Sequence, residues 1–239
     1  MTSLINFQRF LPKDGVQVYP NVFYYDINDI DDKLRMYYKK FFEYDKEYKP
    51  LTQRGRKMSR GKNINKKYCS YIYKGDKLVG LILLFEYLDN PDGYGKNDYR
   101  YTKLIMPQYR GTKYSRYCGA DIMHMVFMSG LAKRLYTYAV ANKTTGTYVD
   151  QIDLKAPCMG EVYESDGPIQ EYMKITKKLT TPYGPYVILE FNGEIYNRMN
   201  LKKYFLAAPG RTEEVADTWI KQMDHAASIM KETIKKSEV

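Results

Sequence analysis

The stretch from Leu104 to Ser115 holds the residues best suited to bind an anion. An apolar segment ends at Pro107, and Arg110 and Gly111 follow in a turn that leads into a segment rich in helix-forming residues. The first turn of a helix exposes unpaired backbone N–H groups and the positive end of the helix dipole, and both attract phosphate. Glycine lets the backbone come close to such a ligand. The pattern therefore predicts a phosphate or pyrophosphate site at this turn.

This stretch resembles the pyrophosphate-binding signature of the GNAT superfamily of acyl-CoA-dependent N-acyltransferases, in which an apolar strand is followed by Pro-x-Tyr-Arg-Gly-x-Gly-x-Gly or Ala and then a helix. The match covers Pro107, Tyr109, Arg110 and Gly111. The order of elements also fits the family over residues 68–148, since a hairpin with an apolar central strand precedes the turn and a strand leading to Asn142 follows the helix. The resemblance implies a protein that binds acetyl-CoA or another acyl-CoA as co-substrate.

Two residues depart from the family's pattern. Lys113 stands where the family usually has glycine, so that a side chain occupies a place of close backbone approach, although its ammonium could itself pair with phosphate. Ser115 replaces glycine or alanine, which is a milder change. The residues that the resemblance implies in acyl-CoA binding are Ile105, Met106, Arg110, Gly111, Thr112, Lys113, Tyr114, Ser115 and Asn142.

Two side chains are predicted to take part in N-acyl transfer. The reaction needs an unprotonated amine, so a carboxylate usually serves as base, and Glu86 at the end of an apolar strand is the best candidate. The alternative is a solvent-facing glutamate before the loop at 89–98. The family commonly protonates the departing thiolate with a tyrosine shortly after the asparagine, and Tyr148 lies six residues after Asn142. A half-buried structural tyrosine is again the alternative. His124 is predicted to be a packed core histidine or a helix-surface histidine rather than a catalyst.

The charge of the chain favours anionic partners. Lys and Arg number 38 against 28 Asp and Glu, which gives a net charge of +10. Residues 46–67 contain nine basic residues and one acidic residue, with little periodic apolar content, so a basic loop is predicted there. This loop is either solvated or an arm that binds DNA, RNA or an acidic protein, with tyrosine rings available for base stacking. The predicted nucleic-acid contacts are Arg54, Arg56, Lys57, Arg60 and Lys62.

Hydrophobic patterns predict an α/β domain, with a GNAT-like mixed, mostly antiparallel central sheet flanked by helices implied by the resemblance. Helices are predicted at 26–48, 114–132 and 212–236, and strands at 68–73, 78–88, 99–106, 135–141, 148–154 and 185–191. The segment 99–141 reads as a strand–helix–strand crossover, and Asn192-Gly193 as a hairpin turn. The amphipathic C-terminal helix could pack within the chain or across a homodimer.

Three parts of the chain are expected: 1–67, an N-terminal helix and basic loop within the same domain; 68–160, the acyl-CoA-binding core; and 161–239, a C-terminal extension with a hairpin and a long helix. The longest apolar run, 78–84, is too short to cross a bilayer, and the first ten residues lack a secretory pattern, so a cytoplasmic location away from membranes is expected. Three cysteines and two histidines without ligand spacing predict no metal site.

The predicted function is that of an enzyme, an N-acyltransferase that moves an acetyl or related acyl group from acyl-CoA to an amine, the amine belonging to a nucleic acid or a protein among other acceptors. The alternative is a protein on a GNAT-like scaffold that binds nucleic acid or a host factor without acyl transfer. The net charge of +10 and the two departures from the signature motivate this alternative.

Overall fold

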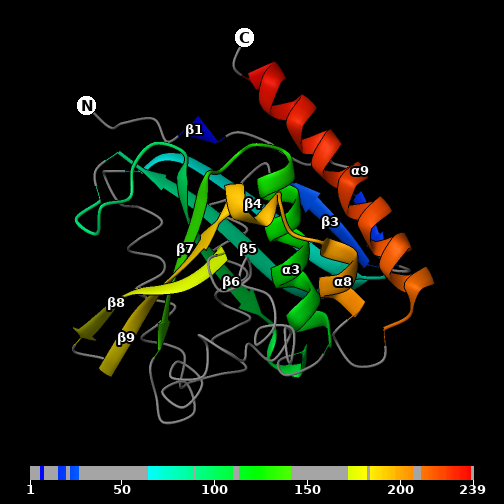
Figure 1. The fold of residues 1–239 in the computed structure, drawn as a ribbon, viewed down its shortest axis with the longest axis horizontal. Helices are drawn as coiled ribbons and strands as arrows, with labels where there is room; N and C mark the ends of the chain where they lie inside the picture. Colours follow the sequence, from blue (N-terminus) through cyan, green and yellow to red (C-terminus); the bar gives the residue numbers. More distant parts are fainter. Residues whose placement is uncertain are drawn as a thin grey trace.

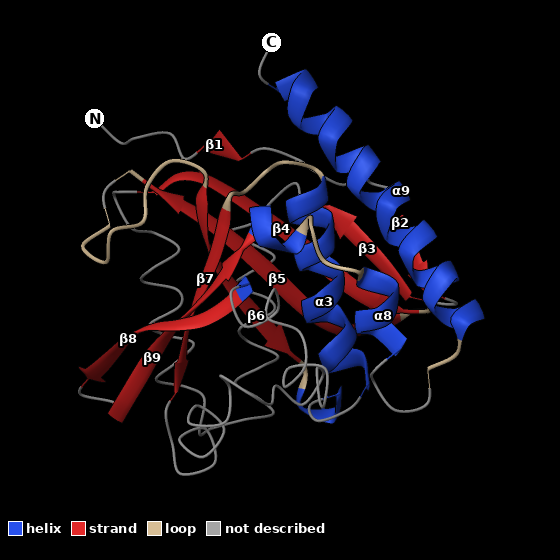
Figure 2. Cartoon of the chain, in the orientation of Figure 1, coloured by secondary structure: helices blue, strands red, loops and turns tan. Residues whose placement is uncertain are grey.

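The computed structural model describes residues 6–7, 16–19, 22–26, 64–88, 90–109, 113–140, 172–181, 184–206 and 211–237. Their strands form one sheet, and the longer helices lie together on one of its faces (Figure 1) (Figure 2). The strands are β1 (Asn6–Phe7), β2 (Val16–Tyr19), β3 (Val22–Asp26), β4 (Ile64–Lys74), β5 (Lys77–Tyr87), β6 (Asp98–Ile105), β7 (Arg134–Val140), β8 (Met173–Thr181) and β9 (Gly184–Asn192). The helices are the 3-10 turn η2 (Pro107–Tyr109), α3 (Lys113–Met128), α7 (Gly193–Tyr196), α8 (Leu201–Leu206) and α9 (Glu213–Ser237).

The sheet is mixed and mostly antiparallel. Its strand order is β2-β3-β4-β5-β6-β7-β9-β8, and β1 pairs with β4 outside this path. The pairs β1 with β4 and β6 with β7 are parallel, whereas all other neighbouring strands among the described residues are antiparallel. The predicted fold class is confirmed.

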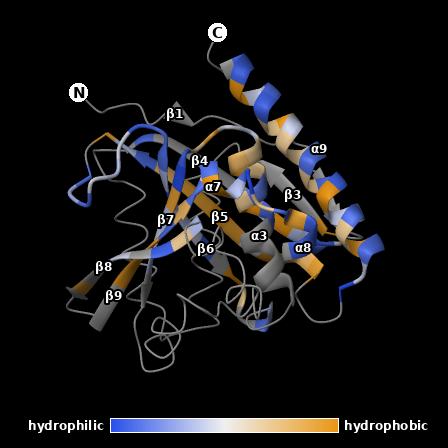
Figure 3. Cartoon of the chain, viewed as in Figure 1, coloured by the Kyte–Doolittle hydropathy of each residue, from blue (hydrophilic) through white to orange (hydrophobic). Residues whose placement is uncertain are grey.

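Strand β5 forms the middle of the core. Its residues are buried from Val79 to Glu86, because strands cover both edges and side chains alternate between the two faces. Ile82 and Leu84 belong to the cluster that α3 and α9 cover, and Leu83 is buried on the opposite face. Figure 3 shows this strand as a hydrophobic band through the molecule. The prediction of a central apolar strand is confirmed.

The predicted strand–helix–strand crossover is also present. β6 leads through η2 into α3, and α3 leads into β7, which runs parallel to β6. Gly130 ends the helix: it adopts the left-handed conformation (φ 77°), and the N–H of Leu131 returns to the carbonyl of Val126 at 3.1 Å. Gly130 thus marks the end of the helix that was predicted at 114–132.

Helix α9 packs within the chain. Its apolar stripe is buried in the same cluster as α3 and the covered face of the sheet, and it consists of Ala216, Trp219, Met223, Ala226 and Met230. Most of its exposed residues are hydrophilic, whereas Val215 is an exposed apolar residue (Figure 3). Of the two alternatives for this stripe, packing within the chain is the one observed. No helix among the described residues has the length and apolar character needed to cross a membrane.

Several boundaries differ from the predictions. Strands β1, β2 and β3 were not predicted, and β4 begins at Ile64, inside the segment predicted as basic loop. The hairpin partner of β9 is β8, which precedes it, so the turn lies before Gly184 rather than at Asn192-Gly193. Asn192 instead caps α7, its Oδ1 accepting from the N–H groups of Glu194 and Ile195 at 3.0 and 3.1 Å. The predicted helix at 26–48 and strand at 148–154 lie outside the described residues.

Candidate functional site

Strands β6 and β7 lie side by side for three residues and then separate. The paired residues are Asp98 with Arg134, Tyr99 with Leu135, and Arg100 with Tyr136. β6 continues to Ile105 along β5, and β7 continues to Val140 along β9. Figure 1 shows β7, β9 and β8 running toward one side of the molecule while β5 and β6 run toward the other. The β6–β7 pairing therefore ends at Arg100 and Tyr136, before either strand ends.

A bidentate ion pair fixes the end at which the two strands are paired. Nε and an Nη of Arg134 donate to the two carboxylate oxygens of Asp98 at 2.9 and 2.6 Å. The Asp98 carboxylate is shielded, and its hydrogen bonds to Arg134 raise the pKa of that guanidinium above its ordinary value. The guanidinium also lies over the ring of Tyr94, 5.2 Å from its centroid. The point of separation is thus set by charged side chains as well as by backbone pairing.

A chain of hydrogen bonds crosses the sheet at the same end. The N–H of Asn97, a residue with φ 69°, donates to Oε1 of Glu86 at 2.7 Å. The carbonyl of Asn97 accepts from the N–H of Lys133 at 2.8 Å, and the carbonyl of Lys133 accepts from the N–H of Gly193 at 2.8 Å. Asn65 donates its Nδ2 to the other oxygen of Glu86 at 2.5 Å. Glu86 thereby links β5 to the starts of β6 and β7.

Glu86 was predicted to be the catalytic base, and its surroundings bear on that role. Its side chain is buried at 1% exposure, and each oxygen already accepts a hydrogen bond. It pairs across the sheet with Tyr99, whereas Ile105 pairs with Gly80 six residues farther along β6. This separation is about 20 Å along the strand. Each oxygen keeps capacity for a further hydrogen bond, and the catalytic role stays a prediction.

The predicted phosphate end of the site lies at the C-terminal end of β6. Ile105 and Met106 are buried there, and the N–H of Met106 donates to the carbonyl of Val79 at 2.9 Å. Lys113, Tyr114 and Ser115 form the first turn of α3, as the signature implies. The structure therefore brings a strand end, a turn and a helix start together, on the side where β6 and β7 have separated. Arg110, Gly111 and Thr112 lie outside the described residues.

The remaining predicted site residues cannot be placed in the same way, since they fall outside the described ranges. They are Asn142, Tyr148, Arg54, Arg56, Lys57, Arg60 and Lys62. Their roles in acyl-CoA binding, proton donation and nucleic-acid binding stay predictions.

On the face of the sheet opposite α3, the loop before β6 covers the point where the strands separate. Tyr94 stacks on Tyr136 with ring centroids 3.8 Å apart and an interplanar angle of 5°. Asn90 donates its Nδ2 to the Tyr136 hydroxyl at 2.7 Å, and burial raises the pKa of that hydroxyl well above its ordinary value. Tyr94 reaches Glu190 on β9 at 3.2 Å. The loop is therefore held against β7 and β9 by stacking and by polar contacts.

The next residue of β7 on this face, Tyr138, lies just past the last β6–β7 pair. Its hydroxyl donates to Oδ2 of Asp92 at 2.5 Å, and Nζ of Lys177 lies 2.7 Å from Oδ1 of the same carboxylate. Arg100 lies over the Tyr138 ring, 4.5 Å from its centroid. Burial alone would raise the pKa of Asp92, but hydrogen bonds from Lys177 and Tyr138 outweigh it and lower that pKa. Asp92 is therefore an ionised carboxylate at neutral pH.

His124 is packed inside the chain, which is the first of its two predicted placements. Its ring is fully buried between α3 and α9, with Nε2 2.8 Å from Oδ1 of Asp224 and Nδ1 2.9 Å from the Tyr196 hydroxyl. A carboxylate only accepts, so Nε2 carries the proton and Nδ1 accepts from Tyr196. Burial lowers the pKa of His124, and Asp224 offsets part of this effect. The histidine thus connects helices and lies apart from the separated strands.

Sequence reasoning missed both polar sets around the separated strands, Asp98 with Arg134 and Tyr138 with Asp92 and Lys177. The alternation of Arg134, Tyr136 and Tyr138 was a usable signal, since it places three polar side chains on one face of a strand. No local sequence pattern identifies the distant residues that these three side chains contact. As for metals, no group of three or more potential ligand residues is present within the described ranges.

Comparisons with known proteins concern the fold. No protein-family model matches the sequence, and no curated protein matches it. A chimera of spermidine N-acetyltransferase SpeG from Vibrio cholerae and hSSAT is 12% identical, with a TM-score of 0.48 over 74% of this chain and 99% of that one. SpeG from Vibrio cholerae in complex with manganese ions is 12% identical, with a TM-score of 0.46 over 75% and 98%. A Desulfovibrio desulfuricans protein described as a GNAT-family acetyltransferase is 12% identical, with a TM-score of 0.42 over 72% and 99%.

The likeness to these acetyltransferase structures is one of fold, at 12% identity.

Proposed function

We propose that this protein binds an acyl-CoA between the separated edges of β6 and β7 and transfers the acyl group to an amine. One observation carries the proposal: the parallel pairing ends at Arg100 and Tyr136 although both strands continue. Two extended strands that diverge in this way leave room between them for an extended ligand that contains amides, which strand backbone groups can bind. The pantetheine arm of coenzyme A is such a ligand.

The start of α3 supports the same placement of the ligand. The helix begins at Lys113, four residues after η2 ends at Tyr109, and the first-turn N–H groups and the dipole of a helix favour an anion. The pyrophosphate of coenzyme A would bind here, with its arm directed along β6 toward Arg100. Lys113 adds a positive charge to the first turn of the helix.

The reaction would proceed by positioning and polarisation. The acyl-CoA supplies an activated thioester, and a backbone N–H of one of the two diverging strands would polarise its carbonyl. Holding the amine against this carbonyl makes the attack effectively intramolecular. The amine loses a proton to a base, for which Glu86 is the predicted residue, and the thiolate leaves with a proton, for which Tyr148 is the predicted donor.

Isothermal titration with acetyl-CoA tests the proposal. The wild-type protein should bind, and Gly111→Glu should weaken binding at least about tenfold, roughly 1.4 kcal/mol, because the new side chain blocks and repels the pyrophosphate. Ser228→Glu places the same charge on the exposed side of α9 and should leave binding unchanged. Absence of binding by the wild type, or unchanged binding by a folded Gly111→Glu variant, would remove the proposal's support.

The second candidate function is binding of a nucleic acid, as acceptor or as partner, and it is favoured by the net charge of +10 and the nine basic residues at 46–67. Binding of a DNA or RNA oligonucleotide should weaken steeply as salt rises, because each phosphate contact releases counterions. Neutralising Arg54, Arg56 and Lys57 together should reduce the slope. Binding that is insensitive to salt would count against this function.

A further inference from the structure

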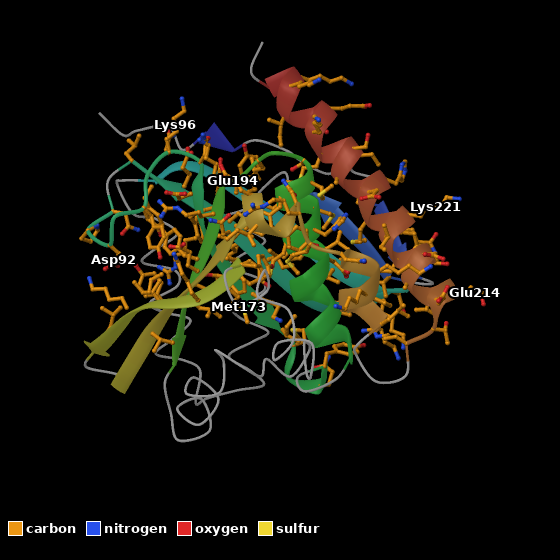
Figure 4. The ribbon with its side chains drawn as sticks, in the orientation of Figure 1. Asp92, Lys96, Met173, Glu194, Glu214 and Lys221 are labelled. Carbon is orange, nitrogen blue, oxygen red and sulfur yellow. The ribbon has the colours of Figure 1, made fainter. Side chains whose placement is uncertain are left out.

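One carboxylate beside the separated strands holds an ammonium group of the protein itself. Asp92 accepts from Nζ of Lys177 at 2.7 Å and from the Tyr138 hydroxyl at 2.5 Å. The two donors take different oxygens, so the carboxylate binds one primary ammonium and one hydroxyl at the same time. Figure 4 labels Asp92 on the side of the molecule where β8 and β9 lie.

The carboxylate is fixed, whereas its ammonium partner is not. The backbone N–H of Asp92 donates to Oδ1 of Asn90 at 2.8 Å, which shapes the loop. The Tyr138 hydroxyl, on β7, holds one oxygen of the Asp92 carboxylate by a hydrogen bond. The Asp92 side chain is 11% exposed, but that of Lys177 is 49% exposed. Lys177 reaches the site with a flexible side chain from β8, the last strand of the sheet order. Exchange of the ammonium therefore requires movement of one exposed side chain only.

The position of this pair relates it to the separated strands. Tyr138 follows Tyr136, the last β7 residue paired with β6, on the same face of the strand. Arg100, the last paired residue of β6, lies over the Tyr138 ring. An amine held by Asp92 and by the oxygen of Tyr138 would thus lie next to the point where the proposed acyl group is presented.

The other carboxylates on this face are less able to exchange their cations. Asp98 is held by a bidentate Arg134, and Glu190 keeps contacts to Arg134 and Tyr94 even without Lys174. The Asp98 and Glu190 side chains are 7% and 6% exposed. An exposed lysine–carboxylate pair contributes little stability, so the Lys177 contact costs little to break.

We propose that Asp92 and Tyr138 form the binding site for a primary alkylammonium group of the acceptor, and that Lys177 occupies this site in the free protein as an internal competitor. The ligand class follows from the occupant, since the lysine side chain is an n-butylammonium group attached to the backbone. That the bound amine is the acyl acceptor rests on the proposed function, whereas binding of an alkylammonium group at Asp92 and Tyr138 does not.

Binding of n-butylammonium chloride, measured by NMR titration without any acyl-CoA, tests the inference. Lys177→Gln should strengthen binding about fivefold, which is the factor that corresponds to the loss of a weak exposed ion pair. Lys174→Gln makes the same charge change on the same strand and should leave binding as in the wild type. Asp92→Asn in the Lys177→Gln background should abolish saturable binding, and Tyr138→Phe should weaken it.

A kinetic measurement distinguishes a site for the amine from an ion pair with a structural role only. With n-butylamine as acceptor and acetyl-CoA as donor, Lys177→Gln should lower the KM for the amine while kcat stays near the wild-type value. Equal amine binding by Lys177→Gln and Lys174→Gln would overturn the inference, as would saturable binding that survives Asp92→Asn. These results leave acetyl-CoA binding untouched, so failure of this inference and failure of the proposed function are distinguishable.

Discussion

Replacement of Glu86 gives the most direct test of how the paired end of β6 and β7 is held. Glu86→Leu removes both acceptor oxygens with little change in volume. It leaves the Asn97 N–H and the Asn65 amide without the partners they now have at 2.7 and 2.5 Å. An unsatisfied buried donor costs about 1–3 kcal/mol, and the leucine recovers part of this through the removal of a buried charge. We expect a loss of about 3 kcal/mol in the free energy of unfolding.

Glu86→Gln should be much milder. The glutamine oxygen can accept from the Asn97 N–H, and its amide can donate to Asn65 after that side chain turns its oxygen inward. Both hydrogen bonds survive without the carboxylate charge, which is worth about 1 kcal/mol for each bond. We expect a loss of about 1–2 kcal/mol, and Glu232→Leu on the exposed side of α9 should change stability by less than about 0.5 kcal/mol.

Urea unfolding at pH 7 measures these differences, with m-values compared to confirm that the same surface is exposed. A Glu86→Leu cost below about 1 kcal/mol, or equal costs for leucine and glutamine, would refute the view that this carboxylate holds Asn97.

The glutamine variant also tests the predicted base. A general base contributes about 10²–10⁴-fold, so a fall of this size in kcat at unchanged acetyl-CoA affinity supports the role, and an unchanged kcat contradicts it.

The close packing of Gly193 and the titration of His124 can each be tested by a stability measurement. Gly193→Ala would place a Cβ 2.6 Å from Cδ1 of Phe127 and 2.9 Å from the Lys133 carbonyl, so thermal unfolding should show a loss of about 1–3 kcal/mol; Gly95→Ala meets nothing within 4 Å and is the control. Because burial lowers the pKa of His124 below its ordinary 6.5, the unfolded state binds more protons, and stability should fall as pH drops below about 6.5. This dependence should be weaker in His124→Gln, and an identical pH profile for both proteins would contradict the assignment.

The elements that the sequence predicted well are those with long, regular patterns. β5 is apolar at successive positions because both its faces are buried, and α9 repeats its apolar residues at helical spacing because one side packs against the core. The crossover from β6 through α3 to β7 follows from the order of strand and helix patterns and from the parallel pairing that such an order favours. These features depend on neighbouring residues, which a single sequence displays.

The features that escaped prediction depend on distant residues or on short segments. β1 and β2 have two and four residues, too few for a period to be recognised, and their pairing partners are supplied by the rest of the sheet. Arg134 and Asp98 are separated by 36 residues, and Lys177 and Asp92 by 85. Neither pair has a sequence spacing from which the contact could be recognised. Asn192-Gly193 has the composition of a hairpin turn, but tertiary packing of Gly193 against Phe127 decides its conformation.

The Asn192-Gly193 step has a consequence for the chemical ageing of the protein. Asparagine followed by glycine is prone to deamidation, in which the backbone nitrogen of the glycine attacks the side-chain amide carbon of the asparagine. Here that nitrogen donates its N–H to the Lys133 carbonyl at 2.8 Å, and Oδ1 of Asn192 accepts from two backbone N–H groups of α7. Both reacting groups are held by other partners, so the folded state slows the deamidation of Asn192. Storage of the protein in denaturant should convert Asn192 to aspartate and isoaspartate faster than storage in buffer. On refolding, the isoaspartate form should lose the cap of α7, whereas an aspartate can still accept from the same two N–H groups.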